Sequence, residues 1–159
     1  MLHLYEYSFN EILNSYTFIT VNGVEYFVYF TDGSNYFEKY KQFASSVYMF
    51  GFYSKPIKKL SSDILVRDTI VSILKDYFEN NKEHILLYVC EQTDGLQYHR
   101  KRKFNGWFHL ANESNIVKED LDIIFENNIT CLSVLYHNSN VHAEEIALAL
   151  SNFESEFLK

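Results

Sequence analysis

The sequence has few of the residues that interrupt regular structure. Its 159 residues include one proline and five glycines, which leaves little room for long loops or for a linker between domains. A chain of this length is the size of one ordinary domain and can bury roughly two thirds of its unfolded surface. We therefore expect a single domain over residues 1–159 that needs no disulfide or metal to hold it together.

Cysteine is also scarce, because Cys90 and Cys131 are the only two. Both lie in apolar runs, and neither belongs to a Cys-x-x-Cys motif or to a cluster with histidine, which is typical of reduced core cysteines in a cytosolic protein. No apolar run reaches the ~18 residues of a membrane span, and the N-terminus lacks the features of a secretory signal. We expect a cytoplasmic protein with no membrane segment.

Positive charge is in deficit and unevenly placed. The chain has 14 Lys and Arg against 21 Asp and Glu, a net charge of −7. Residues 96–109 contribute +4, from Arg100, Lys101, Arg102 and Lys103, so the remainder carries −7 − 4 = −11. An acidic body of this kind repels nucleic acid and anionic membranes at long range. One basic helix can still make a local anion site.

Aromatic residues are abundant, with 13 Tyr, 14 Phe and one Trp making 18% of the chain. They favour strands, and residues 4–9, 16–21 and 24–30 alternate apolar and polar side chains as strands do. Asn22-Gly23 between the last two of these runs is a strong hairpin signal. The first part of the chain therefore predicts an antiparallel meander, followed by a further strand over 47–53.

The second part of the chain mixes helical and strand-like patterns. Helices are predicted over 62–80, over 96–109 and after Asn140, and strands over 85–90, 117–125 and 129–136. The apolar run 85–90 is continuous, which is typical of a strand buried on both faces. These patterns predict an α+β domain, with a mixed, mostly antiparallel sheet of about six strands and two to three helices packed on it.

The chemistry of the chain is concentrated where the 85–90 strand leads into the basic helix. Glu91, Asp94, His99, Arg100 and Arg102 are clustered ionisable residues at this junction, and we take them as candidate ligand- or anion-binding residues. The alternative is structural. Glu91 and Asp94 can cap the helix, which opposes an anionic ligand, and can pair with a half-buried Arg100.

The same helix and the aromatic meander are candidate interaction surfaces. On the helix the candidates are Tyr98, Lys101, Lys103 and Trp107. The meander adds a set of tyrosines, Tyr5, Tyr7, Tyr16, Tyr26, Tyr29, Tyr36, Tyr40, Tyr48 and Tyr53. Tyrosine is enriched at interfaces but is equally common in ordinary strands. Basic and aromatic residues together also suit base stacking in nucleic-acid binding, which the net charge disfavours.

No arrangement of residues names a reaction. Cys90 lies at a strand end near basic residues, as an activated thiol would, but a core cysteine is the simpler interpretation. The histidines are scattered and match no zinc-binding spacing. We therefore predict no catalytic residue, no metal site and no cofactor. This favours a protein that is not an enzyme, and a small enzymatic domain is the alternative.

Several stretches resemble a known family. Leu87-Tyr-Val-Cys-Glu, followed by Arg100-Lys-Arg-Lys-Phe-Asn-Gly-Trp-Phe, is the most specific of them, and Ser15-Tyr-Thr-Phe, Lys55-Pro56 and the helix Thr69–Asn81 are also similar. They resemble DUF6169, a family of uncharacterised bacterial proteins found mainly in Bacteroidota, over nearly the whole chain. Glu91 stands where the family pattern has Asp. The resemblance implies a small cytosolic domain and no particular chemistry.

Three functions remain as hypotheses. The first is a non-enzymatic protein-interaction module of the antitoxin, immunity or defence-accessory type, which binds another protein or itself. The second is a small ligand-binding or enzymatic domain with an anion site at residues 90–102. The third is nucleic-acid binding through the basic helix 96–109.

Overall fold

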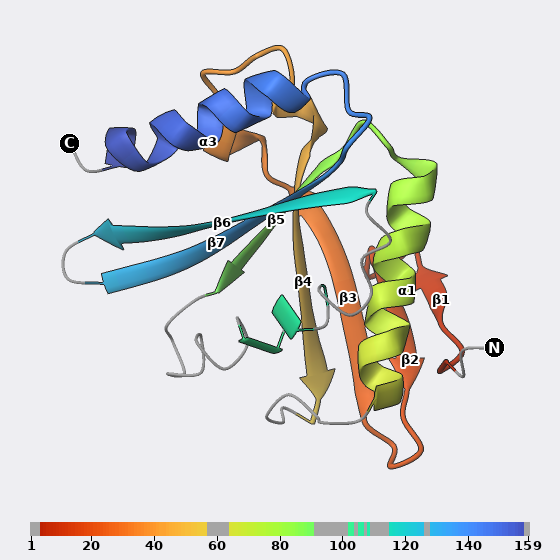
Figure 1. The fold of residues 1–159 in the computed structure, drawn as a ribbon. Coiled ribbons are helices and arrows are strands. Elements are labelled where there is room, and N and C mark those ends of the chain that lie inside the picture. The colour runs from red at the N-terminus through yellow and green to blue at the C-terminus, as the bar shows by residue number, and fades with distance from the viewer. Residues whose placement is uncertain are drawn as a thin grey trace.

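The fold is a seven-stranded mixed sheet with a helix on each face (Figure 1). The computed structural model describes residues 4–56, 64–90, 102–103, 105–106, 108, 115–125 and 128–157. The strands are β1 (Ser8–Asn10), β2 (Ser15–Ile19), β3 (Glu25–Asp32), β4 (Val47–Lys55), β5 (Ile85–Cys90), β6 (Ile116–Phe125) and β7 (Asn128–His137). The helices are α1 (Ile64–Asn80) and α3 (Ala143–Phe157), with short 3₁₀ turns η1 (Ser34–Phe37) and η2 (Ala44–Ser46). The predicted α+β class is confirmed, with seven strands where about six were expected.

The sheet order is β1-β2-β3-β4-β5-β7-β6. β1 to β4 form the predicted antiparallel meander. Its central hairpin turns at Gly23, whose φ of 77° suits glycine. The turn is closed by hydrogen bonds of 2.9 Å from Gly23 N to Thr20 O and from Thr20 N to Val24 O. The Asn22-Gly23 signal therefore predicts the β2–β3 connection correctly.

β5 lies at the centre of the sheet, parallel to β4 and antiparallel to β7. A parallel pair needs a long crossover, and α1 supplies it between β4 and β5. Ile85, Leu86 and Leu87 are fully buried. Successive strand residues face opposite sides of a sheet, so β5 is buried on both faces, as its continuous apolar run predicts.

Two apolar cores follow from this alternation, one on each face of the sheet. On the α1 side, Val66, Ile70 and Ile73 of the helix pack with Val28 and Leu86 of the strands. On the α3 side, the buried helix residues are Ile146, Ala149 and Leu150, and they pack with Val134, with Phe37 of η1 and with Phe43 just before η2. Helical spacing after Asn140 predicts a buried face of Ile146, Ala149, Leu150, Phe153 and Phe157. The first three are confirmed as buried, and the side chains of the two phenylalanines lie outside the described part of the structure.

The N-terminal segment follows α1 before it joins the sheet. β1 is shorter than the strand predicted over 4–9, because its first residues bond to the helix. The backbone N–H of Tyr5 donates to Thr69 Oγ1 at 2.9 Å, and the Tyr7 hydroxyl donates to the Asp76 carboxylate. Thr69 and Asp76 lie two helical turns apart on one face. These two hydrogen bonds therefore join the segment before β1 to α1.

Candidate functional site

Only part of the predicted site at the strand–helix junction is described. Seven candidate residues lie outside the described residues: Glu91, Asp94, Tyr98, His99, Arg100, Lys101 and Trp107. Residues 102–103, 105–106 and 108 are helical, in agreement with the helix predicted over 96–109. Within it Arg102 is exposed and Lys103 is half-buried. The pairing of Arg100 with Glu91 or Asp94 stays a prediction.

This helical segment contacts the sheet through Phe108. Its side chain packs against the α1-side core, and its ring lies 6.0 Å from Lys118 Nζ, within range of a cation–π contact. Lys118 belongs to β6, so the contact places the end of the segment over the outer strands. Of the described motif residues, Phe108 thus packs into the domain, whereas Arg102 is exposed.

Below Phe108 lies a polar group that we name the Asp120 cluster: Lys118, Asp120 and Ser133. Lys118 Nζ donates to both Asp120 carboxylate oxygens at 2.6 and 2.7 Å, and Ser133 Oγ donates to Asp120 Oδ1 at 2.6 Å. Asp120 and Ser133 are opposite each other in the β6–β7 ladder. The Lys118 side chain is only 8% exposed and that of Asp120 is 36% exposed, so the ammonium is the more deeply buried charge.

The Asp120 cluster suits a structural role better than a chemical one. Three contacts from two donors already occupy the carboxylate, and a largely buried ammonium needs such a partner to be tolerated. Alternation along β6 correctly predicts that Lys118 and Asp120 share a face. Alternation does not reveal that Lys118 is buried. Its burial depends on the contact with Phe108, which belongs to another segment of the chain.

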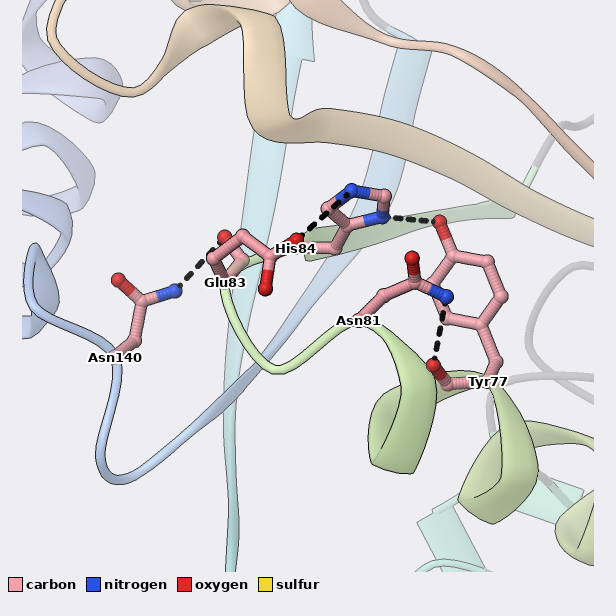
Figure 2. A network of polar contacts seen from close by, with 5 residues as sticks. All are labelled: Tyr77, Asn81, Glu83, His84 and Asn140. Carbon is pink, nitrogen blue, oxygen red and sulfur yellow. Dashed lines mark hydrogen bonds and ion pairs between the residues drawn. The ribbon is translucent and has the colours of Figure 1, made fainter.

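A second polar group joins the end of α1 to the start of β5 (Figure 2). Tyr77 Oη lies 2.7 Å from His84 Nδ1, and His84 Nε2 lies 3.6 Å from Glu83 Oε1. Asn81 Nδ2 donates to the Tyr77 carbonyl at 2.9 Å, and Asn140 Nδ2 donates to the Glu83 carbonyl at 3.2 Å. The group therefore ties three segments together: the helix end, the turn before β5 and the turn before α3.

The electrostatics of this group disfavour proton transfer near neutral pH. Burial lowers the pKa of His84, and Glu83 opposes that shift. Burial also raises the pKa of Tyr77 well above its usual range, with further contributions from Tyr48, Tyr16 and Glu83. The phenol thus keeps its proton and the imidazole stays neutral, so we infer that Tyr77 donates to His84 Nδ1. Sequence reasoning missed this pair because it treated His84 as one of several scattered histidines.

The sheet face opposite α1 carries an aromatic patch on β2, β3 and β4, which we name the aromatic face. It consists of Thr17, Ile19, Phe27, Tyr29, Gly51, Tyr53 and Lys55. The Phe27 and Tyr53 rings stack with centroids 4.7 Å apart, and Lys55 Nζ lies 5.3 Å from the centroid of the Phe27 ring. Tyr29 lies over Gly51, where an added Cβ would overlap its ring. The small residue thus makes room for the phenol.

The aromatic face lies beyond the part of the sheet that α3 covers. In Figure 1, α3 lies at the top of the view, away from the lower parts of β3 and β4. Ile19 is 60% exposed and Tyr53 is 45% exposed, while Phe27 beneath is buried. No described helix packs on this face. The sheet therefore presents Tyr53 and Ile19 to solvent, with the half-buried Tyr29 on the same face.

The tyrosines of the meander thus divide into distinct groups. Tyr5 and Tyr26 are buried, and Tyr7, Tyr16 and Tyr48 pack partly against the α1-side core. Tyr40 packs against the α3-side core. Most of the tyrosines therefore serve packing, and Tyr29 and Tyr53 are those that lie on the aromatic face.

Cys90 and Cys131 are directly opposite each other in the β5–β7 ladder. In the described part of the chain, no group of three or more His, Cys, Asp or Glu residues is placed to hold a metal ion. None of the described helices is both long and apolar enough to cross a membrane.

Comparison with known proteins supports the resemblance seen in the sequence. The model of a family of unknown function, DUF6169, matches residues 62–154. The match extends from the start of α1 into α3 and includes the Tyr-Val-Cys motif and the basic helix, whereas β1 to β4 precede it. No curated protein and no solved structure matches the chain. The match covers more than half of the sequence, and the chain therefore belongs to the DUF6169 family.

Proposed function

We propose that this protein is a non-enzymatic interaction module that binds another protein through its aromatic face. The observation that carries the proposal is the exposure of Tyr53 and Ile19 above the buried ring of Phe27. Tyrosines on a rigid support lose little conformational entropy on binding, and they join a large apolar area to a polar tip. Such side chains are typical anchors of protein interfaces.

The charge of the chain indicates the kind of partner. At −7, two copies repel each other at long range. Lys55 of the aromatic face is opposite Glu25, a neighbouring residue outside that set, in the β3–β4 ladder, so their charges offset locally. We therefore expect a neutral or basic protein as the partner, as in a complex of the antitoxin, immunity or defence-accessory type, rather than a second copy.

The experiment compares two tyrosine variants of similar exposure. Tyr53→Arg alters the aromatic face, and Tyr36→Arg alters a tyrosine outside it that is also exposed. Proteins retained by the tagged chain from a lysate of its own cells are identified, and the purified partner is titrated by calorimetry. Loss of one anchor of about 2 kcal/mol weakens Kd at least tenfold. We expect that loss for Tyr53→Arg and an unchanged Kd for Tyr36→Arg.

Three outcomes would contradict the proposal. One is that no protein is retained, and another is that both variants bind with the affinity of the unaltered chain. The third is that light scattering shows a dimer of the chain that Tyr53→Arg dissociates, which would assign the aromatic face to a second copy. Circular dichroism and the thermal midpoint of each variant exclude misfolding as the cause of a lost interaction.

A second candidate function is the anion site at residues 90–102, with nucleic acid as one possible anion. It is supported by the exposure of Arg102 on the helical segment, since an exposed guanidinium is available to a carboxylate or phosphate. Anion binding at this site is measured by titration with inorganic phosphate and with a single-stranded oligonucleotide at low salt. Binding that Arg102→Gln abolishes would favour this candidate, and salt-sensitive binding of the oligonucleotide alone would favour nucleic acid.

A further inference from the structure

The turn between β1 and β2 carries apolar side chains that the fold leaves in solvent. Ile12 is 95% exposed, Leu13 is 53% exposed, and Phe9 in β1 is 48% exposed. Single exposed apolar residues are common on protein surfaces, but these three lie within five consecutive positions. We name Phe9, Ile12 and Leu13 the hairpin tip. Exposed apolar side chains that are grouped in this way mark an interaction surface.

The turn that carries the hairpin tip is held in shape by its own polar groups. Asn10 Oδ1 accepts hydrogen bonds from the backbone N–H of Ile12 at 3.0 Å and from that of Leu13 at 3.1 Å. Asn14 follows with a φ of 48°, a left-handed conformation that asparagine tolerates. A turn that is already ordered loses little conformational entropy when it binds. The two apolar side chains are therefore presented on a prepared support.

The surroundings of the hairpin tip are acidic. Glu11 is exposed within the turn itself. Asn14 Nδ2 donates to the Phe30 carbonyl at 3.5 Å, which places the end of β3, with the exposed Asp32, beside the turn. Residues 1–38 hold five Asp and Glu and no Lys or Arg. This part of the chain therefore has a net charge of 0 − 5 = −5, and no lysine or arginine within it offsets the carboxylates near the tip.

This charge selects among the possible occupants of the hairpin tip. An anionic membrane and a nucleic acid are both repelled by carboxylates. A second copy that met the first tip to tip would bring its own Glu11 and Asp32 against the same residues. A protein surface with an apolar recess and a rim of Lys or Arg fits both features of the tip. The recess takes the aliphatic side chains, and the rim offsets the carboxylates.

We propose that the hairpin tip docks into an apolar recess of a basic protein partner, with Ile12 and Leu13 as anchors and Glu11 as a charged contact at the rim. Removal of the anchors from water supplies the affinity. The carboxylates speed association and make it depend on salt. The tip precedes Ser15 at the start of β2, whereas Ile19 of the aromatic face ends that strand. The two surfaces are therefore distinct, and this proposal does not depend on the aromatic face.

The first experiment identifies the protein that touches the hairpin tip in the cells that make this chain. The photoreactive residue p-benzoylphenylalanine replaces Ile12 in the full chain. In a matched variant it replaces Val141, an apolar residue that is 84% exposed in the turn before α3. Neither replacement removes a packed side chain. We expect position 12, and not position 141, to crosslink to one protein, at an apolar segment with neighbouring Lys or Arg that a peptide map locates.

The second experiment measures the affinity of that purified protein by calorimetry at low and high salt. The double variant Ile12→Ser with Leu13→Ser should weaken Kd about tenfold or more, because both anchors are lost. Val141→Ser should leave Kd unchanged. Glu11→Gln should weaken binding at low salt and reduce its dependence on salt. The altered side chains are largely exposed, so the thermal midpoint of each variant should match that of the unaltered chain.

The proposal is overturned if position 12 gives no crosslink, gives the same proteins as position 141, or crosslinks to a second copy of the chain. It is equally overturned if the double variant binds as tightly as the unaltered chain, or if salt has no effect on Kd. A partner held by the aromatic face alone would be lost in Tyr53→Arg and unaffected by the changes at the tip. The two proposals can therefore fail separately.

Discussion

The Tyr77–His84 hydrogen bond should contribute measurably to stability, and Tyr77→Phe isolates that contribution. The Tyr77 ring stacks on Phe30 with centroids 4.1 Å apart, and phenylalanine keeps that contact. What is lost is the hydroxyl 2.7 Å from His84 Nδ1. Because the His84 side chain is only 19% exposed, water replaces the phenol poorly. Leaving a buried polar atom unsatisfied costs about 1–3 kcal/mol, and partial exposure places the cost near the lower end of that range.

The assay is urea unfolding, with the free energy of unfolding taken from the midpoint and slope. Tyr36→Phe is the matched control, since an exposed phenol should change stability by less than about 0.5 kcal/mol. In a His84→Leu background the cost of Tyr77→Phe should fall close to that of the control, since the partner is gone. If Tyr77→Phe costs no more than the control, or costs the same with and without His84, the bond does not stabilise the fold as argued.

Two further predictions concern the same histidine and the aromatic face. Because burial lowers the pKa of His84 in the folded chain, the unfolded state takes up its proton first as the pH falls below about 6.5. This contribution to the free energy of unfolding is complete above that pH and is lost as the pH falls towards the folded pKa, by at most ~1.4 kcal/mol per pH unit. Urea unfolding between pH 5 and 8 should show it in the unaltered chain and show less in His84→Gln; equal slopes would refute it. Gly51→Ala should displace the Tyr29 ring and destabilise the chain by about 1 kcal/mol, since the moving atoms are the end of a side chain. In a Tyr29→Ala background, Gly51→Ala should leave the free energy of unfolding nearly unchanged. A loss of stability as large as in the unaltered chain would show that the strain lies in the backbone and not in the Tyr29 ring.

The sequence predicted elements that local patterns control. The apolar run 85–90 gave a central strand, Asn22-Gly23 gave a hairpin, and helical spacing gave α1 and the buried face of α3. Each of these signals is contained within a short window of the chain, where periodicity and turn chemistry act directly. The parallel pairing of β4 with β5 has no such local signal.

The candidate sites depend on contacts between distant segments, and the sequence predicted them less well. Alternation over 117–125 does not show whether Lys118 is solvated or enclosed, and in the fold its ammonium is enclosed beside Phe108 and Asp120. Tyr29 and Tyr53 could not be separated from the other tyrosines, because the face that α3 leaves uncovered is decided by the order of strands in the sheet. Cys90 and Cys131 are partners through register alone.

The two edges of the sheet differ in a way that bears on self-assembly. An edge strand offers unpaired backbone groups to any other strand, and long flat edges promote aggregation. β1 is an edge of three residues, too short to recruit a strand firmly. β6, the other edge, has ten residues but carries Lys118, Glu119, Asp120 and Asp122 along its length. A second chain adding to β6 would bring its own carboxylates against these, so this chain should stay dispersed at high concentration and meet its partners face to face rather than edge to edge.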